Sequence, residues 1–513
     1  MRVSLYLLVL LLGACATQHL SKTAAPAPPA PPGTALPAPA AEDLLQQLKL
    51  VSLLESHGEY SSADKVLARV IAADGFQALE GAHQHLALQL GAATALQLHD
   101  PQRGFSLIKR ACEMPQTDGL DWYLRVRAAN IVRDSTDAAM ALTVLAQRGP
   151  QLLARLQDDA ALDPAMNALG NYGSDADRYR VLSALFTAYF PTEPESSSGW
   201  WGDLALLQLM RGERATAIAT LGRVTNPYVV ISIEADKRFD PIRSQIENRL
   251  NVEEITRRAI DTAARRVQHN PDMLEPMLHL ANLLDVSLRF EAVLRVAEVA
   301  IDRQEAQGRS VYTDYDKRYV GILDYRAEAL FNLGRWDAAV EQLQTAAAMA
   351  QSGGPNVAQV IDLANLYADL GRPQESLATL QRLKPATASA FGDMQAELVK
   401  LYALVQLRDI KSANESLRFL SDHRGDSLGV YQEALLVADR KDEAARLLIS
   451  RLADPRLRAD ALVVVQQYSE GTLPPWMLQE DQLWRALLER QDVKQAIARV
   501  GTVRRYPLTQ PGY

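Results

Sequence analysis

The stretch from Leu323 to Ala350 constrains the fold most, because it holds two helical patterns separated by a short turn. Gly334 stands in that turn, where glycine adopts the left-handed conformation that ends many helices. Ala327 and Ala339 are small at places where paired helices must approach closely, and Leu343 supplies a larger packing residue. The stretch therefore predicts an antiparallel helical hairpin.

The same pattern returns along the chain. The next copy contains Ala364 and Gly371, and Gly371 follows Gly334 by 37 residues. Weaker copies have turn glycines at Gly58 and Gly212. Because several copies occur in register, a repeated helical hairpin explains them better than chance does. Further copies, which lack the turn glycine, surround Phe290 and occupy residues 395–454.

These copies resemble the tetratricopeptide (TPR) repeat, a unit of about 34 residues with a small residue eighth, glycine fifteenth, an aromatic residue seventeenth and alanine twentieth. Ala327, Gly334, Trp336 and Ala339 occupy those places. The resemblance covers most of the chain from about residue 43 to 500. It implies an all-α fold, namely a TPR-like helical-hairpin solenoid that forms either one array or two.

One segment interrupts the pattern. Within residues 226–243, the run Tyr228 to Ile233 looks extended, and Asp240-Pro241 is typical of a helix start. We place a boundary near residue 245, between an N-terminal degenerate array (43–245) and a C-terminal array (246–503). The alternative is an irregular loop inside one continuous solenoid. The tail 504–513 contains Pro507 and Pro511, which cannot continue a helix, so we expect it to be disordered.

The N-terminus predicts the location of the protein. Arg2 and a short apolar run precede Leu12-Gly13-Ala14-Cys15, which resembles the lipobox of bacterial lipoproteins. The resemblance implies a signal peptide (1–14), lipid attachment at Cys15, and an outer-membrane anchor that leaves the protein facing the periplasm. Residues 15–42 are rich in alanine and proline and predict an extended tether. A plain secretory signal with a chance cysteine is the alternative.

Composition narrows the classes of partner. The net charge is −8, and it becomes −9 without residues 1–14, which carry Arg2 and no acidic residue. An acidic chain without a basic run argues against nucleic acid. The two cysteines are Cys15 and Cys112, and lipid on the first would exclude an intramolecular disulfide. We expect Cys112 to be a buried small residue.

Motifs for catalysis and metal binding are weak. Gly425 to Gly429 matches the Gly-x-Ser-x-Gly elbow of serine hydrolases at Ser427, but helical sequence flanks it and no histidine follows His423. We therefore expect Ser427 to begin a helix. His83 and His85 point to different faces of a helix and are expected at the surface. We predict no catalytic residue, no metal site and no cofactor.

Binding remains as the predicted function. In TPR proteins the first helix of each hairpin lines a concave surface that holds protein partners. The resemblance implies a groove that uses Tyr325, Glu328, Asn332, Asp362, Asn365 and Asp369, although each of these can also be an ordinary solvated residue. The lysines and arginine of the carboxylate clamp found in some TPRs are missing, which argues against an acidic peptide ligand.

The leading hypothesis is a non-enzymatic periplasmic TPR adaptor lipoprotein that organises an envelope assembly or export complex. Its partners would be envelope proteins and, through the lipid, the membrane. The sequence leaves the oligomeric state open. The alternatives are a pilotin-like assembly lipoprotein for a pilus or secretin and, in a different class, a serine hydrolase at Ser427.

Overall fold

The computed structural model describes residues 41–158, 160–187, 197–349, 356–383, 389–469 and 471–511. The predicted signal peptide, Cys15 and the tether up to residue 40 lie outside these residues. The chain forms two compact units, Met1–Pro194 and Glu195–Tyr513. The division therefore falls about fifty residues before the boundary that the sequence analysis placed near 245.

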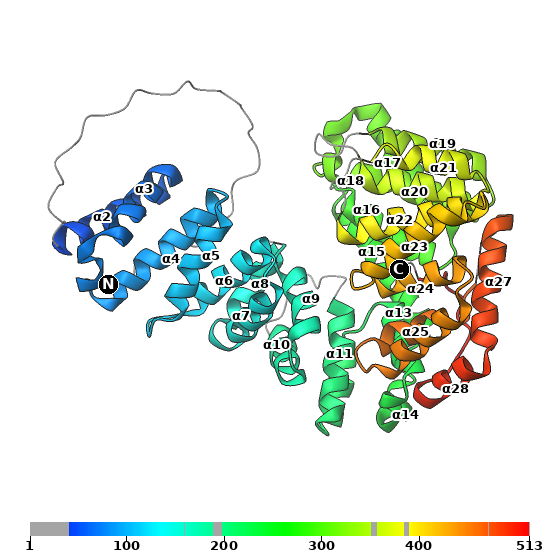
Figure 1. The fold of residues 1–513 in the computed structure, drawn as a ribbon, viewed down its shortest axis with the longest axis horizontal. Helices are drawn as coiled ribbons and strands as arrows, with labels where there is room; N and C mark the ends of the chain where they lie inside the picture. Colours follow the sequence, from blue (N-terminus) through cyan, green and yellow to red (C-terminus); the bar gives the residue numbers. More distant parts are fainter. Residues whose placement is uncertain are drawn as a thin grey trace. The chain divides into compact units, whose positions relative to one another are not determined.

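The first unit consists of helices that pack mainly on their neighbours in the chain, as Figure 1 shows in blue and cyan. α2 already begins at Ala41, where the sequence analysis still placed the tether. The helices are α2 (Ala41–Ser56), α3 (Tyr60–Ala72), η1 (Asp74–Ala78), α4 (Gly81–Gln97), α5 (Pro101–Cys112), α6 (Gly119–Val132), α7 (Ser135–Arg148), η2 (Pro150–Leu152), α8 (Leu153–Asp158), α9 (Leu162–Tyr172) and α10 (Asp175–Thr187).

The second unit continues the helical hairpins and ends in a segment that returns to its beginning. Its helices are α11 (Ser197–Met210), α12 (Arg214–Leu221), α13 (Pro227–Ala235), η3 (Lys237–Ile242), α14 (Arg243–Ile246), α15 (Val252–His269), α16 (Glu275–Val286), α17 (Phe290–Gln307), η4 (Arg309–Val311), α18 (Tyr315–Asn332), α19 (Trp336–Ala348), α20 (Val357–Asp369), α21 (Pro373–Leu380), α22 (Ala390–Gln406), α23 (Ile410–Asp422), α24 (Leu428–Val437), α25 (Lys441–Ala453), α26 (Arg458–Val464), α27 (Pro475–Glu489) and α28 (Gln491–Val500).

The hairpin turns confirm the repeat. Gly334 and Gly371 have φ of 75° and 71°, so both adopt the left-handed conformation predicted for them. The copies that lack a glycine keep the same backbone conformation with other residues. Leu288, Arg408 and Asp439 have φ of 62°, 57° and 57° at the turns α16–α17, α22–α23 and α24–α25. The repeat geometry therefore persists where its sequence signature is lost.

Small buried residues bring the helices of each hairpin together. Ala327 of α18 and Ala339 of α19 are almost fully buried, and they share one core with residues of α16, α17 and α20. The first helices also contact one another along the array, because α16 packs on α18, and α22 packs on both α20 and α24. They form an inner layer, against which α27 lies through α20 and α24.

Two sequence predictions about irregular segments are wrong. Residues 228–233 are helical rather than extended, because Asn226 accepts hydrogen bonds from the backbone N–H groups of Tyr228 and Val229 and so caps α13. Asp240 lies inside η3, whose N-cap is Asp236. Helix formation by this run depends on its cap and on packing against α15 and α26, which override the β-branched composition.

The expectation of a disordered tail is also wrong for the described residues up to 511. Tyr506 and Leu508 are 5% and 2% exposed. The Tyr506 hydroxyl donates to Glu234 Oε2 at 2.9 Å, and the Tyr228 hydroxyl donates to the Thr509 carbonyl at 2.9 Å. The tail therefore docks on α13, so that the two segments outside the repeat pattern pack on each other.

The fold is all-α: the described residues contain isolated bridges but no named strand. None of their helices combines the length and the apolar character that a membrane crossing needs.

A candidate acidic cavity in the second unit

A cavity of about 400 Å³ lies inside the second unit, and we call it the inner cavity. Its wall comes from the C-terminal parts of α16, α18, α22 and α24, from α27, and from the tail residues 509–511. Its volume falls in the range of about 300–1,000 Å³ that is typical of small-molecule pockets. The inner layer of first helices, α27 and the tail thus border a space of ligand size.

Five carboxyl groups line the inner cavity, whereas no lysine, arginine or histidine does. Asp481 has a partner just outside, because Arg485 Nε donates to its Oδ2 at 2.6 Å. Within the described residues, the other four form no ion pair with a basic side chain. The five carboxyl groups belong to Asp285, Glu328, Glu433, Glu480 and Asp481.

Asp285 and Glu328 form the first acidic pair. Desolvation raises the pKa of Asp285 to about 6, while that of Glu328 rises to about 8 through desolvation and repulsion by Asp285, Asp362 and Asp324. Glu328 keeps exposed surface because the cavity is open to water, yet protein surrounds it closely enough to weaken its solvation. The two groups hydrogen-bond to each other when one carries a proton.

Glu433 and Glu480 form a second acidic group with Tyr402 and Asp369. The Tyr402 hydroxyl donates to Glu433 Oε1, and Asp369, which is 8% exposed, lies close enough to repel Glu433 and Glu480. Desolvation, together with repulsion by neighbouring carboxylates, raises the pKa of Glu480 to about 9 and that of Asp369 to about 8. At neutral pH this side of the cavity therefore retains protons that exposed carboxyl groups would release.

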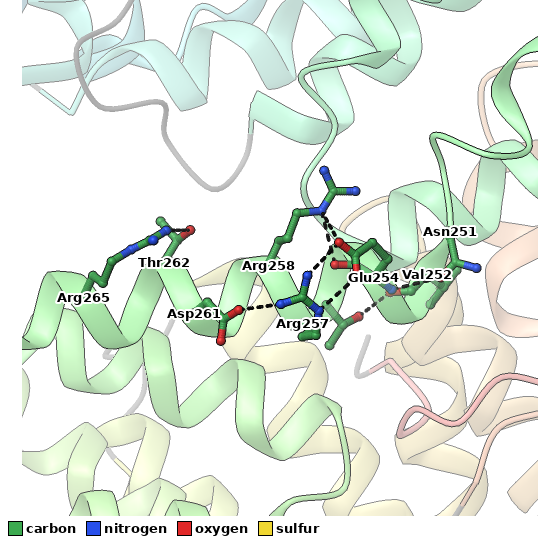
Figure 2. A network of polar contacts seen from close by, with 9 residues as sticks. Asn251, Val252, Glu254, Arg257, Arg258, Asp261, Thr262 and Arg265 are labelled. Carbon is green, nitrogen blue, oxygen red and sulfur yellow. Dashed lines mark hydrogen bonds and ion pairs between the residues drawn. The ribbon is translucent and has the colours of Figure 1, made fainter.

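Carboxylates on the outside of the same unit are compensated, as Figure 2 shows for α15. Glu254 accepts hydrogen bonds from Arg257 Nε and Nη2 at 2.9 and 2.8 Å, and Arg257 Nη1 donates to Asp261 at 2.8 Å. Arg258 Nε lies 3.2 Å from Glu254 Oε1. Glu254 and Asp261 of α15 thus have basic partners, whereas four of the five carboxyl groups in the inner cavity lack one in the described part of the chain.

An apolar surface completes the inner cavity. Phe331 and Leu436 contribute from the inner layer, and Met477 and Trp484 contribute from α27. A ligand in this space would meet carboxyl groups on one part of the wall and aromatic or aliphatic side chains on another. Such a wall suits an aliphatic chain that ends in a positive charge.

The structure distributes the six predicted groove residues unevenly. Glu328 and Asn332 line the inner cavity, and Asp369 is buried beside it. Asn365 Nδ2 donates to Asp369 Oδ2 at 3.0 Å. Tyr325 and Asp362 lie on the first helices α18 and α20 but do not line the cavity; Tyr325 is half-buried against the core and Asp362 is exposed. Asp369 is thus too buried for the groove position expected of it.

Four residues of the cavity were not predicted from the sequence, although a signal for two of them existed. They are Asp285, Tyr402, Glu433 and Glu480. Tyr402 and Glu433 stand six residues before the left-handed residues of their turns, Arg408 and Asp439. Glu328 and Asn365 have the same offset from Gly334 and Gly371. Extending the groove position into the copies without glycine would have found them, whereas the approach of α27 and Glu480 has no local signal.

The sequence predictions for Ser427 and Cys112 have clear outcomes. Ser427 caps α24 and accepts from the Val430 N–H at 3.3 Å, as expected of a helix start. Cys112 is buried, and desolvation raises its pKa to about 12. No group of three or more potential metal ligands gathers in the part of the chain that the structure describes.

The surface position predicted for His85 is wrong. The side chain is buried, and its Nε2 lies 2.6 Å from Asp121 Oδ2. The hydrogen bond with Asp121 raises the pKa of His85. Periodicity could not place His85, because α4 packs on α3, α5 and α6 and so has more than one buried face.

Fold and cavity together define an all-α helical-hairpin repeat protein with an acidic cavity that is partly open to water. No protein-family model matches the chain, and no curated protein matches it. Among solved structures, the chain is similar to the hetero-tetramer of the anaphase-promoting complex Cut9-Hcn1, with 11% identity over 89% of this chain and 90% of that chain and a TM-score of 0.29.

Two further solved structures are similar at the same low level. They are Naa15/Naa10 bound to HypK-THB, with 12% identity, coverage of 86% and 73% and a TM-score of 0.22, and the P58(IPK) TPR domain, with 15% identity, coverage of 80% and 99% and a TM-score of 0.20. Because these TM-scores are low, the fold assignment rests on the helical hairpins and their turns.

Proposed function

We propose that the protein is a non-enzymatic adaptor that binds a polypeptide partner through the inner layer of its second unit. The observation that carries this proposal is the inner cavity, whose wall combines carboxyl groups with apolar side chains on first helices of successive hairpins. Stacked hairpins are widely used as extended binding surfaces. Ser427, the one residue in a hydrolase-like motif, serves as a helix cap and so gives no support to the hydrolase alternative.

The location of this adaptor is the envelope. Leu12-Gly13-Ala14-Cys15 supports a lipid anchor at Cys15, and the segment up to residue 40 supports a tether that holds the helical units away from the membrane. The adaptor would thus organise an assembly or export complex from the periplasmic face of the outer membrane. The proposal for location rests on the sequence alone.

Crosslinking in intact cells tests the adaptor function. The full chain is recovered from detergent-solubilised membranes, and crosslinked polypeptides are identified by mass spectrometry. We expect a defined partner with the wild type that is lost with Glu328→Lys, which places a positive charge in the cavity. Glu254→Lys, which makes the same charge change on α15, should retain the partner. A partner profile that is identical for all three proteins would contradict the proposal.

Lipid labelling tests the anchor separately. We expect the wild type to incorporate labelled fatty acid and to partition into detergent, whereas Cys15→Ala should remain an uncut precursor without label. Equal labelling of both proteins would contradict lipidation at Cys15 while leaving the crosslinking result unaffected.

A further inference from the structure

The inner cavity contains a buried carboxyl group that has few donors, in addition to its acidic character. Asp285 is 6% exposed and lines the cavity, and apart from the carboxyl group of Glu328 no donor within the described residues bonds to its buried Oδ1. An unsatisfied buried carboxylate oxygen costs free energy, so such atoms in folded proteins call for a partner. The residue borders the inner cavity, so a donor bound there would lie close to this carboxyl group. Asp285 therefore marks a place where a donor from outside the chain would be stabilised.

The charge around Asp285 specifies the kind of donor. Glu328 stands beside it, Glu433 and Glu480 stand across the same cavity, and no basic side chain lines the wall. Neutral donors would leave the repulsion among these carboxyl groups unchanged, whereas a cation would relieve it. In a site partly shielded from water, this gain is larger than at an exposed surface.

The shape and the apolar wall specify what carries the charge. A volume of about 400 Å³ is too large for a bare ion to contact both acidic pairs. Phe331 and Trp484 offer aromatic surface to an aliphatic stem or to the face of a guanidinium group. The absence of a clustered metal-ligand set among the described residues agrees with an organic cation.

We propose that the inner cavity binds an aliphatic cation, an ammonium or guanidinium group on an apolar stem, which a lysine or arginine side chain of a partner polypeptide supplies. The proposal deepens the adaptor function and rests on it for the choice of a polypeptide. The cation lies between the Asp285–Glu328 pair and Glu480, and its stem lies on Trp484 and Met477. A free polyamine has the same chemistry and is the other possible source.

Binding of a cation should release protons. Glu328 and Glu480 retain protons near neutral pH because of desolvation and repulsion by neighbouring carboxylates, and a bound positive charge favours their ionised forms. Glu328 and Glu480 have pKa values of about 8 and about 9, so they are the main proton donors at pH 7. The groups that face them are Asp285 on α16, Asp324 on α18, Asp362 and Asp369 on α20, Tyr402 on α22, Glu433 on α24, Asp481 and Arg485 on α27, and Tyr228 on α13.

Calorimetric titration of the full chain in detergent tests the proposal. The probe is a blocked tripeptide with arginine between two leucines, and its control has citrulline in place of arginine. We expect the arginine peptide to bind at least about tenfold more tightly than the citrulline peptide, since the two differ only in charge and donor geometry. In two buffers of different ionisation enthalpy at pH 7, its apparent binding enthalpy should differ in the direction of proton release.

Two variants assign this binding to the cavity. Glu328→Gln combined with Glu480→Gln should weaken the arginine peptide at least about tenfold and abolish the proton release. Glu254→Gln on α15 removes a carboxylate at the surface and should change neither property. Circular dichroism melting of each variant establishes that it is folded, and the buffer dependence of the wild type provides a readout that needs no variant.

The outcomes separate this proposal from the adaptor function. Equal affinity for the arginine and citrulline peptides, or unchanged binding by the folded double variant, would overturn the cation site. The adaptor function would then be tested only by the crosslinking experiment. Binding of spermidine without binding of the arginine peptide would overturn the polypeptide source and assign the cavity to a free polyamine.

Discussion

At the scale of single residues, the same repeat position has different roles along the inner layer. Glu328, Asn365, Tyr402 and Glu433 share one offset from their turn residues, yet Asn365 supports buried Asp369 whereas Tyr402 donates to Glu433. The residue type at such a position decides whether its side chain lines the cavity or forms a hydrogen bond with a neighbouring residue. A position in the repeat therefore predicts which residues meet but not what they do.

Asp369 provides a test of how burial affects its proton. Its pKa of about 8 lies above the ordinary value of 3.8, so between these limits the folded state holds a proton that the unfolded chain releases. Stability from this group is therefore present at low pH and lost as the pH rises toward and through about 8. Asp369→Asn, which keeps an acceptor for Asn365, should remove this loss.

We expect the fall in unfolding free energy between pH 5.5 and 8.5 to be smaller in Asp369→Asn than in the wild type by about 3 kcal/mol. Urea titration followed by tryptophan fluorescence measures the unfolding free energy of the second unit at each pH, because this unit contains all tryptophans except Trp122. Asp337→Asn, on an exposed side chain paired with Arg372, is the control. A pH dependence that both variants share with the wild type would show that Asp369 is ionised throughout.

At the scale of helices, the left-handed turn residue explains how hairpins persist without their glycine. A non-glycine residue in this conformation costs roughly 1–2 kcal/mol, which tertiary packing must offset. Leu288 lies against the core of α16–α20, so packing there offsets part of the cost. Arg408 is exposed and has no such compensation. The turns thus differ in how much strain they retain.

Exchanging residues at three turns measures that strain. In Gly371→Ala, the added Cβ meets no atom within 4 Å. This change should therefore lower the unfolding free energy by about 1 kcal/mol, which is the cost of the left-handed backbone conformation alone. Gly334→Ala should cost more, because its Cβ would lie 3.3 Å from Thr472 Cγ2. Arg408→Gly should instead stabilise the second unit by about 0.5–1 kcal/mol.

Denaturant titration by tryptophan fluorescence gives all three values, and Arg408→Ala serves as the control that removes the side chain but keeps the strain. The explanation fails if Arg408→Ala stabilises as much as Arg408→Gly, because loss of the arginine side chain would then account for the gain.

At the scale of the whole chain, the sequence predicted what depends on local pattern and missed what depends on distant packing. The hairpins could be predicted from the turn glycines Gly334 and Gly371 and from the small residues Ala327 and Ala339. These signals are local, because the two helices of a hairpin are adjacent in the sequence. The helix after Asn226 was missed, since β-branched residues outweighed a capping signal that was present. The docked tail was missed because its contacts join residues more than 200 positions apart.

The docked tail predicts a dependence of the second unit on its last residues. Tyr506 is buried against Tyr468, its hydroxyl donates to Glu234, and residues 509–511 close one side of the inner cavity. Tyr506→Ala should therefore destabilise the second unit by about 3 kcal/mol through the lost ring, whereas Tyr506→Phe should cost only about 1 kcal/mol for the lost hydrogen bond.

Hydrogen exchange shows where the alanine variant loses structure. It should lose protection in α13 and in the backbone around Gln467, whose N–H and carbonyl bond to the tail at 3.0 and 2.8 Å. Helices α4 to α7 of the first unit should keep theirs. Unchanged protection of α13 in Tyr506→Ala would mean that the array closes without its tail, and the cavity would then have to be treated as open on that side.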